Sequence, residues 1–123
     1  MSDERIFTIQ EANESLPDLR ERLPRLRDAR RRLIGAAARI SDAVASDGGG
    51  VAGSDWFDAQ QTVKVDLEYL AKAGILLRDP EAGLVDFPAV RDGEPVFLCW
   101  RLGEDEVTHF HAEESGFTGR KPW

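Results

Sequence analysis

An apolar stripe with alternating steps of three and four constrains the fold of this chain more than any other feature. The stripe, interrupted by one arginine, comprises Leu16, Leu19, Leu23, Leu26, Arg30, Leu33, Ala37, Ile40 and Val44. This spacing puts the residues on one side of a long α-helix, because about 3.6 residues complete a turn. A long apolar stripe has to be covered, so the pattern predicts packing against another long helix. We expect the Arg30 side chain to extend from the stripe toward water.

A second stretch with the same spacing predicts the partner helix. It begins at a cap formed by Ser54 or Asp55, ends at Gly74, and carries the positions Trp56, Gln60, Val63, Leu67, Leu70 and Gly74. The residues between the two helices, 46–53, are rich in glycine and predict a flexible linker. Two helices joined in this way form an antiparallel hairpin, which we expect over about residues 9–73.

The start of the hairpin contains signals for a helix cap and for a kink. Thr8 and Glu11 have the spacing of a capping box, which predicts that a helix begins near Ile9. Pro17 and Pro24 each lack an amide donor and crowd the preceding turn. The sequence therefore predicts a short first helix, or a kink near residues 15–17, ahead of the main helix.

The remainder of the chain predicts short antiparallel strands. Apolar segments at 75–77, 84–87, 96–102 and 106–111 are separated by turn residues, including Asp92-Gly93, and Pro88 is expected to stop the second strand. We expect a three- to four-stranded antiparallel β-meander over about residues 75–111, followed by a docked C-terminal tail at 112–123. The predicted fold is a single α+β domain, 1–123, in which the long kinked hairpin packs on the meander.

Composition narrows the class of protein. The chain has 123 residues, a formal net charge of −7 and a single cysteine, so it contains no internal disulfide. Its polar start lacks the apolar core of a secretory signal, and no stretch approaches the roughly 18 apolar residues of a membrane span. We therefore expect a cytoplasmic protein that does not enter a membrane.

Charge is divided unevenly along the chain. Residues 20–39 hold eight arginines and two acids, a net charge of +6, whereas residues 79–114 hold ten acids and two arginines, a net charge of −8. The arginine block could bind phosphate groups, but the acidity of the whole chain opposes nucleic-acid binding. We expect the two blocks to complement each other within one molecule or between copies.

Both histidines lie in the last predicted strand and suggest a metal site. His109 and His111 are two residues apart, so their rings leave the same face of a strand, and Glu113 would follow them. Asp86 lies on another predicted strand and could join them. Histidine and carboxylate ligands suit Zn, Mn or Fe. His111 is the first candidate ligand, followed by His109, with Glu113 or Asp86 supplying oxygen.

Four further residues could complete a pocket. Cys99 next to His111 and a carboxylate could form a thiolate pair, although a cysteine among apolar residues is more often a small core residue. Trp100 and Arg120 could stack on a base or hold a phosphate, but Trp100 is more simply a core residue. Glu104 is one of many carboxylates, and nothing in the sequence pairs it with a second one at a fixed separation.

Several motifs together resemble a known family. They are Phe7-Thr8-x-x-Glu11-Ala12-Asn13, Gly83-Leu84-Val85-Asp86-Phe87-Pro88, Arg91-Asp92-Gly93, Leu98-Cys99-Trp100-Arg101-Leu102-Gly103-Glu104, His111 and Gly116-Phe117-x-Gly119-Arg120. The sequence is similar in these to a bacterial domain-of-unknown-function family, number 2203, over nearly the whole chain. The resemblance implies a small cytoplasmic bacterial protein and brings no established activity. His109 lies outside the family's pattern, so a site that needs both histidines is not implied.

The sequence predicts a self-associating interaction or binding module. The stripe of the first helix is longer than the second helix can cover, and uncovered apolar surface favours association. We expect a homodimer formed through the helical stripe. The alternative is a metal-binding protein or metal-dependent enzyme that uses His111, His109 and the nearby carboxylates.

Overall fold

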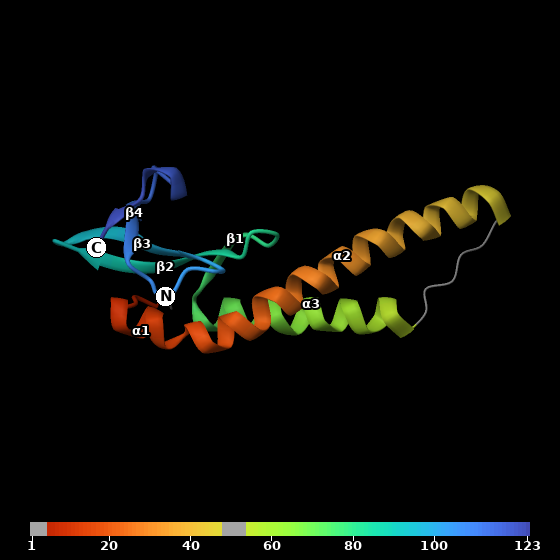
Figure 1. Cartoon of the computed structure of the whole chain (residues 1–123), viewed down its shortest axis with the longest axis horizontal. Helices are drawn as coiled ribbons and strands as arrows, with labels where there is room; N and C mark the ends of the chain where they lie inside the picture. The colour runs from red at the N-terminus through yellow and green to blue at the C-terminus, as the bar shows by residue number, and fades with distance from the viewer. Residues whose placement is uncertain (1–4, 48–53) are drawn as a thin grey trace.

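A helical hairpin extends from one end of a five-stranded antiparallel sheet (Figure 1). The computed structural model describes residues 5–47 and 54–123, without the side chains of residues 39–47 and Ser54. The short helix α1 (Ile9–Glu14) precedes the hairpin, which consists of α2 (Leu16–Asp47) and α3 (Ser54–Ala73). The α+β class and the hairpin are thereby confirmed, but the prediction of three or four strands was wrong.

The start of the chain forms a separate short helix. Thr8 caps α1 with both hydrogen bonds of the capping box, from the Glu11 amide to the Thr8 hydroxyl and from the Thr8 amide to the Glu11 carboxylate. Ser15 separates α1 from α2, and Pro17 is the second residue of α2, where a helix needs no amide donor. Pro24 lies within α2, which continues as a helix beyond it.

The end of α2 changes the predicted linker. The helix continues to Asp47, so the first two residues of the expected linker at 46–53 are helical. The other linker residues, 48–53, lie outside the described residues. At the other end of α3, Gly74 follows the last helical residue with φ +79°, the left-handed conformation predicted for the cap.

The contact face of α2 differs from the predicted stripe in its second half. The buried residues are Leu16, Leu19, Leu23, Leu26, Ala29 and Ala36, whereas Arg30 is half-buried and Ala37 is exposed. The Arg30 guanidinium turns outward to Glu81, at 3.2 Å. Small alanines let the two helices approach, which explains why Ala29 and Ala36 occupy the contact. The predicted positions Ile40 and Val44 have side chains outside the described residues.

The contact face of α3 is rotated from the predicted one. The predicted position Leu67 is 44% exposed, while the preceding residue, Asp66, is fully buried against α2. Ala59 and Leu70 are buried on the same side as Asp66. The predicted apolar position Leu67 is thus replaced at the contact by the charged Asp66, and the reason lies in the arginines of α2.

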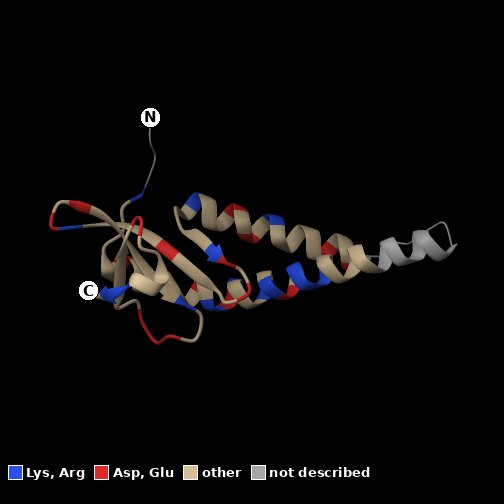
Figure 2. Ribbon diagram, turned by 90° about the horizontal axis from the view of Figure 1, so that it is seen from above, with Lys and Arg blue, Asp and Glu red and all other residues tan. Residues whose placement is uncertain are grey.

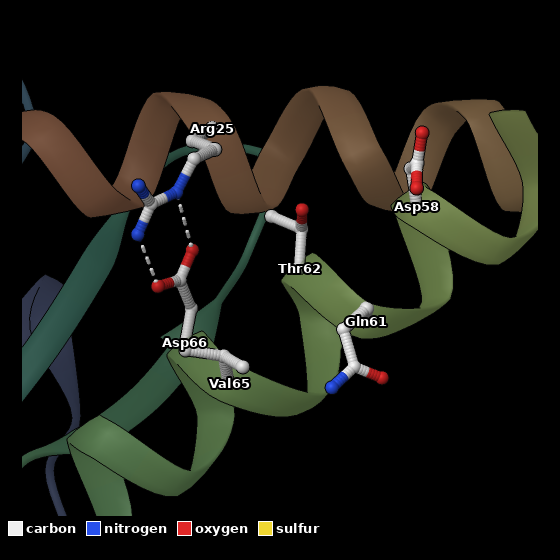
Figure 3. Close-up of a pocket in the computed structure, with 6 residues that line it drawn as sticks. All are labelled: Arg25, Asp58, Gln61, Thr62, Val65 and Asp66. Carbon is white, nitrogen blue, oxygen red and sulfur yellow. Dashed lines mark hydrogen bonds and ion pairs between the residues drawn. The ribbon is translucent and has the colours of Figure 1, made fainter.

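Two arginines of α2 hold the buried carboxylate of Asp66, and Figure 3 shows one of them, Arg25. Arg25 donates two hydrogen bonds, from Nη2 to Oδ1 at 2.6 Å and from Nε to Oδ2 at 3.0 Å, and Arg22 donates a third to Oδ1 at 2.8 Å. Arg22 also stacks over the Tyr69 ring, 3.8 Å from its centroid. This ion pair satisfies a buried charge and fixes which side of α3 faces α2.

The sheet contains β1 (Leu76–Asp79), β2 (Leu84–Arg91), β3 (Glu94–Arg101), β4 (His109–Ala112) and β5 (Lys121–Pro122), in the order of the chain. β2 and β3 form a tight hairpin in which Asp92 and Gly93 both have positive φ, as the Asp-Gly turn predicts. The fifth strand lies in the segment that we expected to dock as a tail. It has only two residues, too few for an alternating pattern in the sequence.

Pro88 does not stop β2, contrary to the prediction. β1 pairs with β2 only as far as Asp86, so Pro88 lies where no strand needs its missing amide. Its carbonyl accepts a hydrogen bond from the amide of Phe7, at 2.7 Å. A proline at a strand edge is tolerated for this reason.

One face of the sheet forms the core with the helices. Alternate residues of β2 and β3 point toward the helices and are buried with Phe7 and the leucines of α2; they are Val85, Phe87, Ala89, Val96, Leu98 and Trp100. The opposite face carries the residues between them, among them Asp86, Phe97 and Cys99. The polar residues singled out in the sequence are thus divided between two faces.

Side chains from the helices also bind the loops of the sheet. The Asn13 amide bonds both backbone groups of Val107, accepting from its nitrogen at 2.7 Å and donating to its oxygen at 3.3 Å. Glu81, in the turn between β1 and β2, receives Arg30 and Arg31 from α2. Figure 2 shows acidic residues on the turns of the sheet and many basic residues on α2. The expected complementarity of the two charge blocks is therefore partly met within one molecule.

We predict that removing the two arginines costs more stability than removing their carboxylate. The double variant Arg22→Ala/Arg25→Ala leaves Asp66 between the helices without a cation and should lower the free energy of unfolding by about 3 kcal/mol. Asp66→Ala should cost less, because both arginines can reach water. Urea denaturation measures both, with Arg31→Ala as a surface control that changes little. Equal losses for Asp66→Ala and the double variant would contradict the argument.

Candidate functional site

The outer face of the sheet brings together most of the residues predicted to form a site. Asp86 of β2 lies opposite Cys99 of β3, and Cys99 lies opposite His109 of β4. His111 lies opposite Phe97 on the same face, so the segments containing Cys99 and His111 are neighbours. This juxtaposition was predicted from the two-residue spacing and the expected meander.

Trp100 is the exception among the predicted pocket residues. It points to the opposite face and is fully buried in the core, where its indole nitrogen donates to the carbonyl of Glu104 at 3.1 Å. The Arg20 guanidinium lies 5.8 Å from its ring centroid. Trp100 therefore cannot stack on a ligand at the outer face, and its proposed part in such a pocket was wrong.

Asp86, His111 and Arg78 form a hydrogen-bonded group at the centre of the outer face. The carboxylate of Asp86 lies 3.1 Å from Nε2 of His111 through one oxygen and accepts from Nε of Arg78 at 2.8 Å through the other. Nδ1 of His111 lies 2.7 Å from the carbonyl of Ala112. Asp86 and His111 are both buried, whereas Arg78 is partly exposed. Every polar atom of the Asp86 and His111 side chains therefore has a partner.

The partners of His111 determine where its protons lie. A carbonyl can only accept, so the nitrogen next to Ala112 must donate to it. A hydrogen bond between the other nitrogen and Asp86 then also requires a proton between them. Both ring nitrogens of His111 are therefore engaged by partners in this arrangement, and neither is free for a substrate or a metal.

A cavity of about 280 Å³ adjoins this group. Asp86, His111 and Glu113 all line it, together with Arg78 and with residues of the C-terminal segment. Three of the four predicted metal ligands therefore meet at one cavity, and His109 does not line it. Within residues 5–47 and 54–123, however, no three His, Cys, Asp or Glu residues are grouped closely enough to hold a metal ion. Arg78 supplies the positive charge beside Asp86.

A second polar group lies beside the first and contains Cys99, Glu104 and Arg120. Arg120 and Glu104 form an ion pair with Nη2–Oε2 at 2.8 Å, and the other oxygen of Glu104 accepts from the amide of Arg101 at 2.8 Å. Arg120 also lies over the ring of Phe117, 4.2 Å from its centroid. The C-terminal segment thus covers part of the outer face and contributes one of its charged residues.

The surroundings of Cys99 and Glu104 shift their protonation in opposite directions. Burial raises the pKa of the Cys99 thiol to about 11, although a hydrogen bond from Arg120 acts against this. Burial also opposes ionisation of Glu104, but the hydrogen bonds from Arg120 and from the Arg101 amide outweigh it and lower its pKa. At neutral pH the thiol is therefore protonated and the carboxylate is ionised and paired.

These contacts leave Cys99 and His111 without the features of an activated group. A nucleophilic cysteine needs a lowered pKa, and a general base needs a free lone pair within reach of a substrate. Cys99 lacks the first and His111 lacks the second. In the described part of the chain, no buried side-chain nitrogen or oxygen is without a hydrogen-bond partner. Asp86 with His111, and Glu104 with Arg120, thus form closed hydrogen-bonded pairs on this face.

Two residues that matter here escaped the sequence argument. Arg78 completes the group around Asp86, and Asp66 carries the ion pair of the hairpin. The sequence did contain a signal for Asp66. This acid is next to a stripe position of the second helix, and the first helix, which was expected to pack against it, carries Arg22 and Arg25 three residues apart. Arg78 had none, because a bulge between Leu77 and Asp79 shifts the register of β1.

A comparison with protein families matches residues 5–123 to the family described as "Uncharacterized conserved protein (DUF2203)". The match covers nearly the whole chain and agrees with the resemblance seen in the motifs. No curated protein and no solved structure was found to match the chain. The comparisons therefore add no substrate, partner or reaction to the geometry described above.

We predict that Cys99 is inert in the folded protein. A rise in pKa from 9.0 to about 11 reduces the thiolate fraction at neutral pH about a hundredfold, and burial further blocks access. A chromogenic disulfide reagent should react at least a hundredfold more slowly with the native protein than with the protein in denaturant. The assay is unambiguous because the chain has one cysteine. Rapid reaction of the native protein would show that the thiol is accessible and activated.

Proposed function

The chain belongs to the DUF2203 family of uncharacterized conserved proteins, and from that premise we propose that it is a non-catalytic module that binds copies of itself through its helical hairpin. The observation that carries the proposal is the exposure of large apolar side chains on the hairpin. Ile34 is 56%, Phe57 68%, Val65 45% and Leu67 44% exposed. Phe57 and Val65 are eight residues apart and so share one side of α3, and adjoining exposed apolar side chains support an interaction site.

The position of the hairpin supports the proposal. It extends beyond the sheet, so the distal parts of α2 and α3 are not covered by strands (Figure 1). Arg30 and Arg31 mark the last contact with the sheet, through Glu81, and Ile34 lies one turn further along the same side of α2. Ile34 is therefore exposed just beyond the part of α2 that contacts Glu81.

The outer face of the sheet supports a binding role rather than catalysis. Asp86 is engaged with His111 and Glu104 with Arg120, and the thiol is protonated. A reaction would require these bonds to be broken before a substrate could be engaged. Association through the hairpin requires no such rearrangement.

Partners other than a second copy are less favoured by the charges. Six arginines of the block at 20–39 contact acidic side chains or backbone carbonyls of the same chain; they are Arg20, Arg22, Arg25, Arg27, Arg30 and Arg31. Such contacts weaken the case for nucleic-acid binding, in which arginines must reach phosphates.

Among the described residues, no helix is both long and apolar enough to cross a membrane. We propose the cytoplasm as its location, as expected for a free cysteine.

We predict a concentration-dependent dimer. Sedimentation equilibrium should give a mass that rises toward twice 13.7 kDa as the concentration increases. A variant in which Phe57 and Val65 are both serine should remain folded and weaken this association, since these two side chains lie on one exposed side of α3 and would bury apolar area only in the complex.

The matched control changes the exposed apolar residues outside the hairpin. Ile6, Leu76 and Val90 are also exposed, and their joint replacement by serine should leave the association unchanged. A wild-type protein that stays monomeric up to millimolar concentration would refute self-association. Loss of association in the control alone would move the interface to the sheet.

A divalent-metal site remains the second candidate, favoured by one observation. Asp86, His111 and Glu113 line the same cavity, and together they offer one nitrogen and two carboxylates. Binding Zn, Mn or Fe would require His111 to release Asp86 or Ala112 and Arg78 to move away from Asp86. His109 would have to approach from outside this cavity.

This second candidate makes its own prediction. Protein purified without added metal should contain one equivalent of Zn, Mn or Fe by elemental analysis, and His111→Ala should release it while the fold survives. The control is His109→Ala, which should retain the metal because His109 does not line the cavity. Metal-free protein that also fails to bind zinc in a titration would eliminate the site.

A further inference from the structure

A groove between α2 and α3 lies next to the ion pair of Asp66. It has a volume of about 390 Å³ and is lined by Arg25, Asp58, Gln61, Thr62, Val65 and Asp66. Figure 3 shows Arg25 joined to Asp66 and Thr62 lying between the two helices, with Asp58 further along α3. Val65, one of the exposed apolar residues, forms part of this groove.

Two further charges flank the groove at one level of the hairpin. Arg25 contacts Asp66, which fixes the level at which α2 and α3 meet. Arg32 lies seven residues after Arg25 and Asp58 eight residues before Asp66, about two turns along each helix in the same direction. A spacing of seven keeps Arg32 on the same side of α2 as Arg25. Both are exposed, and neither forms an ion pair within the described residues.

The arrangement of these two charges is self-complementary. A two-fold axis that runs parallel to the hairpin, with the grooves of two copies facing, places α2 of one copy over α3 of the other. Arg32 of each copy then lies opposite Asp58 of its partner, because both residues lie at one level. An axis across the hairpin would instead oppose α2 with α2. It would bring like charges together if it passed at the level of Arg32 and Asp58, and at any other level it would leave both residues without a counter-charge. In a two-fold symmetric dimer each contact occurs twice, so the interface contains two Arg32–Asp58 pairs, one from each copy to its partner.

We propose, resting on the self-association proposed above, that the groove of α2 and α3 is the surface where two copies meet. The two hairpins run parallel to each other and form a four-helix arrangement with two Arg32–Asp58 pairs. Val65 and the other residues of the groove lie at its centre, and the charged pairs form its rim. Rim charges set the orientation and the choice of partner more than the total affinity. The Arg32–Asp58 pairs therefore favour the dimer in which the hairpins run parallel over the dimer in which α2 faces α2.

The test uses opposite charge reversals in separate copies of the full chain. Asp58→Lys alone and Arg32→Glu alone each place two pairs of like charges across the interface. Each should weaken the dimer about tenfold or more in sedimentation equilibrium at low salt. An equimolar mixture of the two variants restores both attractive pairs and should form a one-to-one heterodimer with near wild-type affinity. Restoration on mixing also shows that both variants are folded.

Matched controls carry the same charge changes elsewhere on the surface. Glu114→Lys and Arg101→Glu alter exposed residues of the C-terminal segment and of β3, and both should dimerise as the wild type does. If Asp58→Lys and Arg32→Glu also dimerise normally, or if their mixture stays monomeric, the groove is not the interface, although self-association stands. A monomeric wild type would overturn the proposed function itself.

Discussion

The ion pair between Asp66 and two arginines of α2 determines how the hairpin is assembled. A fully buried carboxylate is tolerated between two helices only because Arg22 and Arg25 supply three hydrogen bonds and two charges. This requirement rotates α3 so that Asp66 faces α2 and Leu67 faces outward. The exposure of Leu67 is therefore a consequence of one polar contact. The same contact sets the level of α2 against α3, on which the proposed pairing of two copies depends.

The sheet and the hairpin divide the properties of the molecule between them. On the outer face of the sheet, Asp86, His111, Glu104 and Arg120 satisfy one another, and the C-terminal segment covers part of them. On the hairpin, apolar and charged side chains remain exposed. Functional surfaces are more often those with unsatisfied binding capacity than those with closed networks. This contrast supports the proposal that the function lies on the helices, although the candidate chemistry in the sequence lay on the strands.

The motifs that resemble the family acquire structural roles in the fold. Thr8 and Glu11 cap α1, and Asn13 bonds both backbone groups of Val107. Glu104, in the turn after β3, forms an ion pair with Arg120. Arg91 donates to the backbone oxygen of Trp123 and lies between the rings of Phe110 and Trp123. These contacts hold loops and the last strand in place. They explain why such residues occur as motifs without requiring a reaction.

Local patterns in the sequence were sufficient for the hairpin, the capping box, the Asp-Gly turn and the neighbouring strands of Cys99 and His111, because each depends on spacing or on residues close in the chain. Tertiary structure alone decided the buried side of α3, the continuation of β2 through Pro88, the fifth strand and the partner of Asp86. Each of these depends on what a distant segment supplies: a pair of arginines, an unpaired edge, a strand to join, or a guanidinium displaced by a bulge. Spacing shows which residues share one side of a helix. Whether the side that carries Asp66 is buried depends on the position of its counter-charges, Arg22 and Arg25, on another helix.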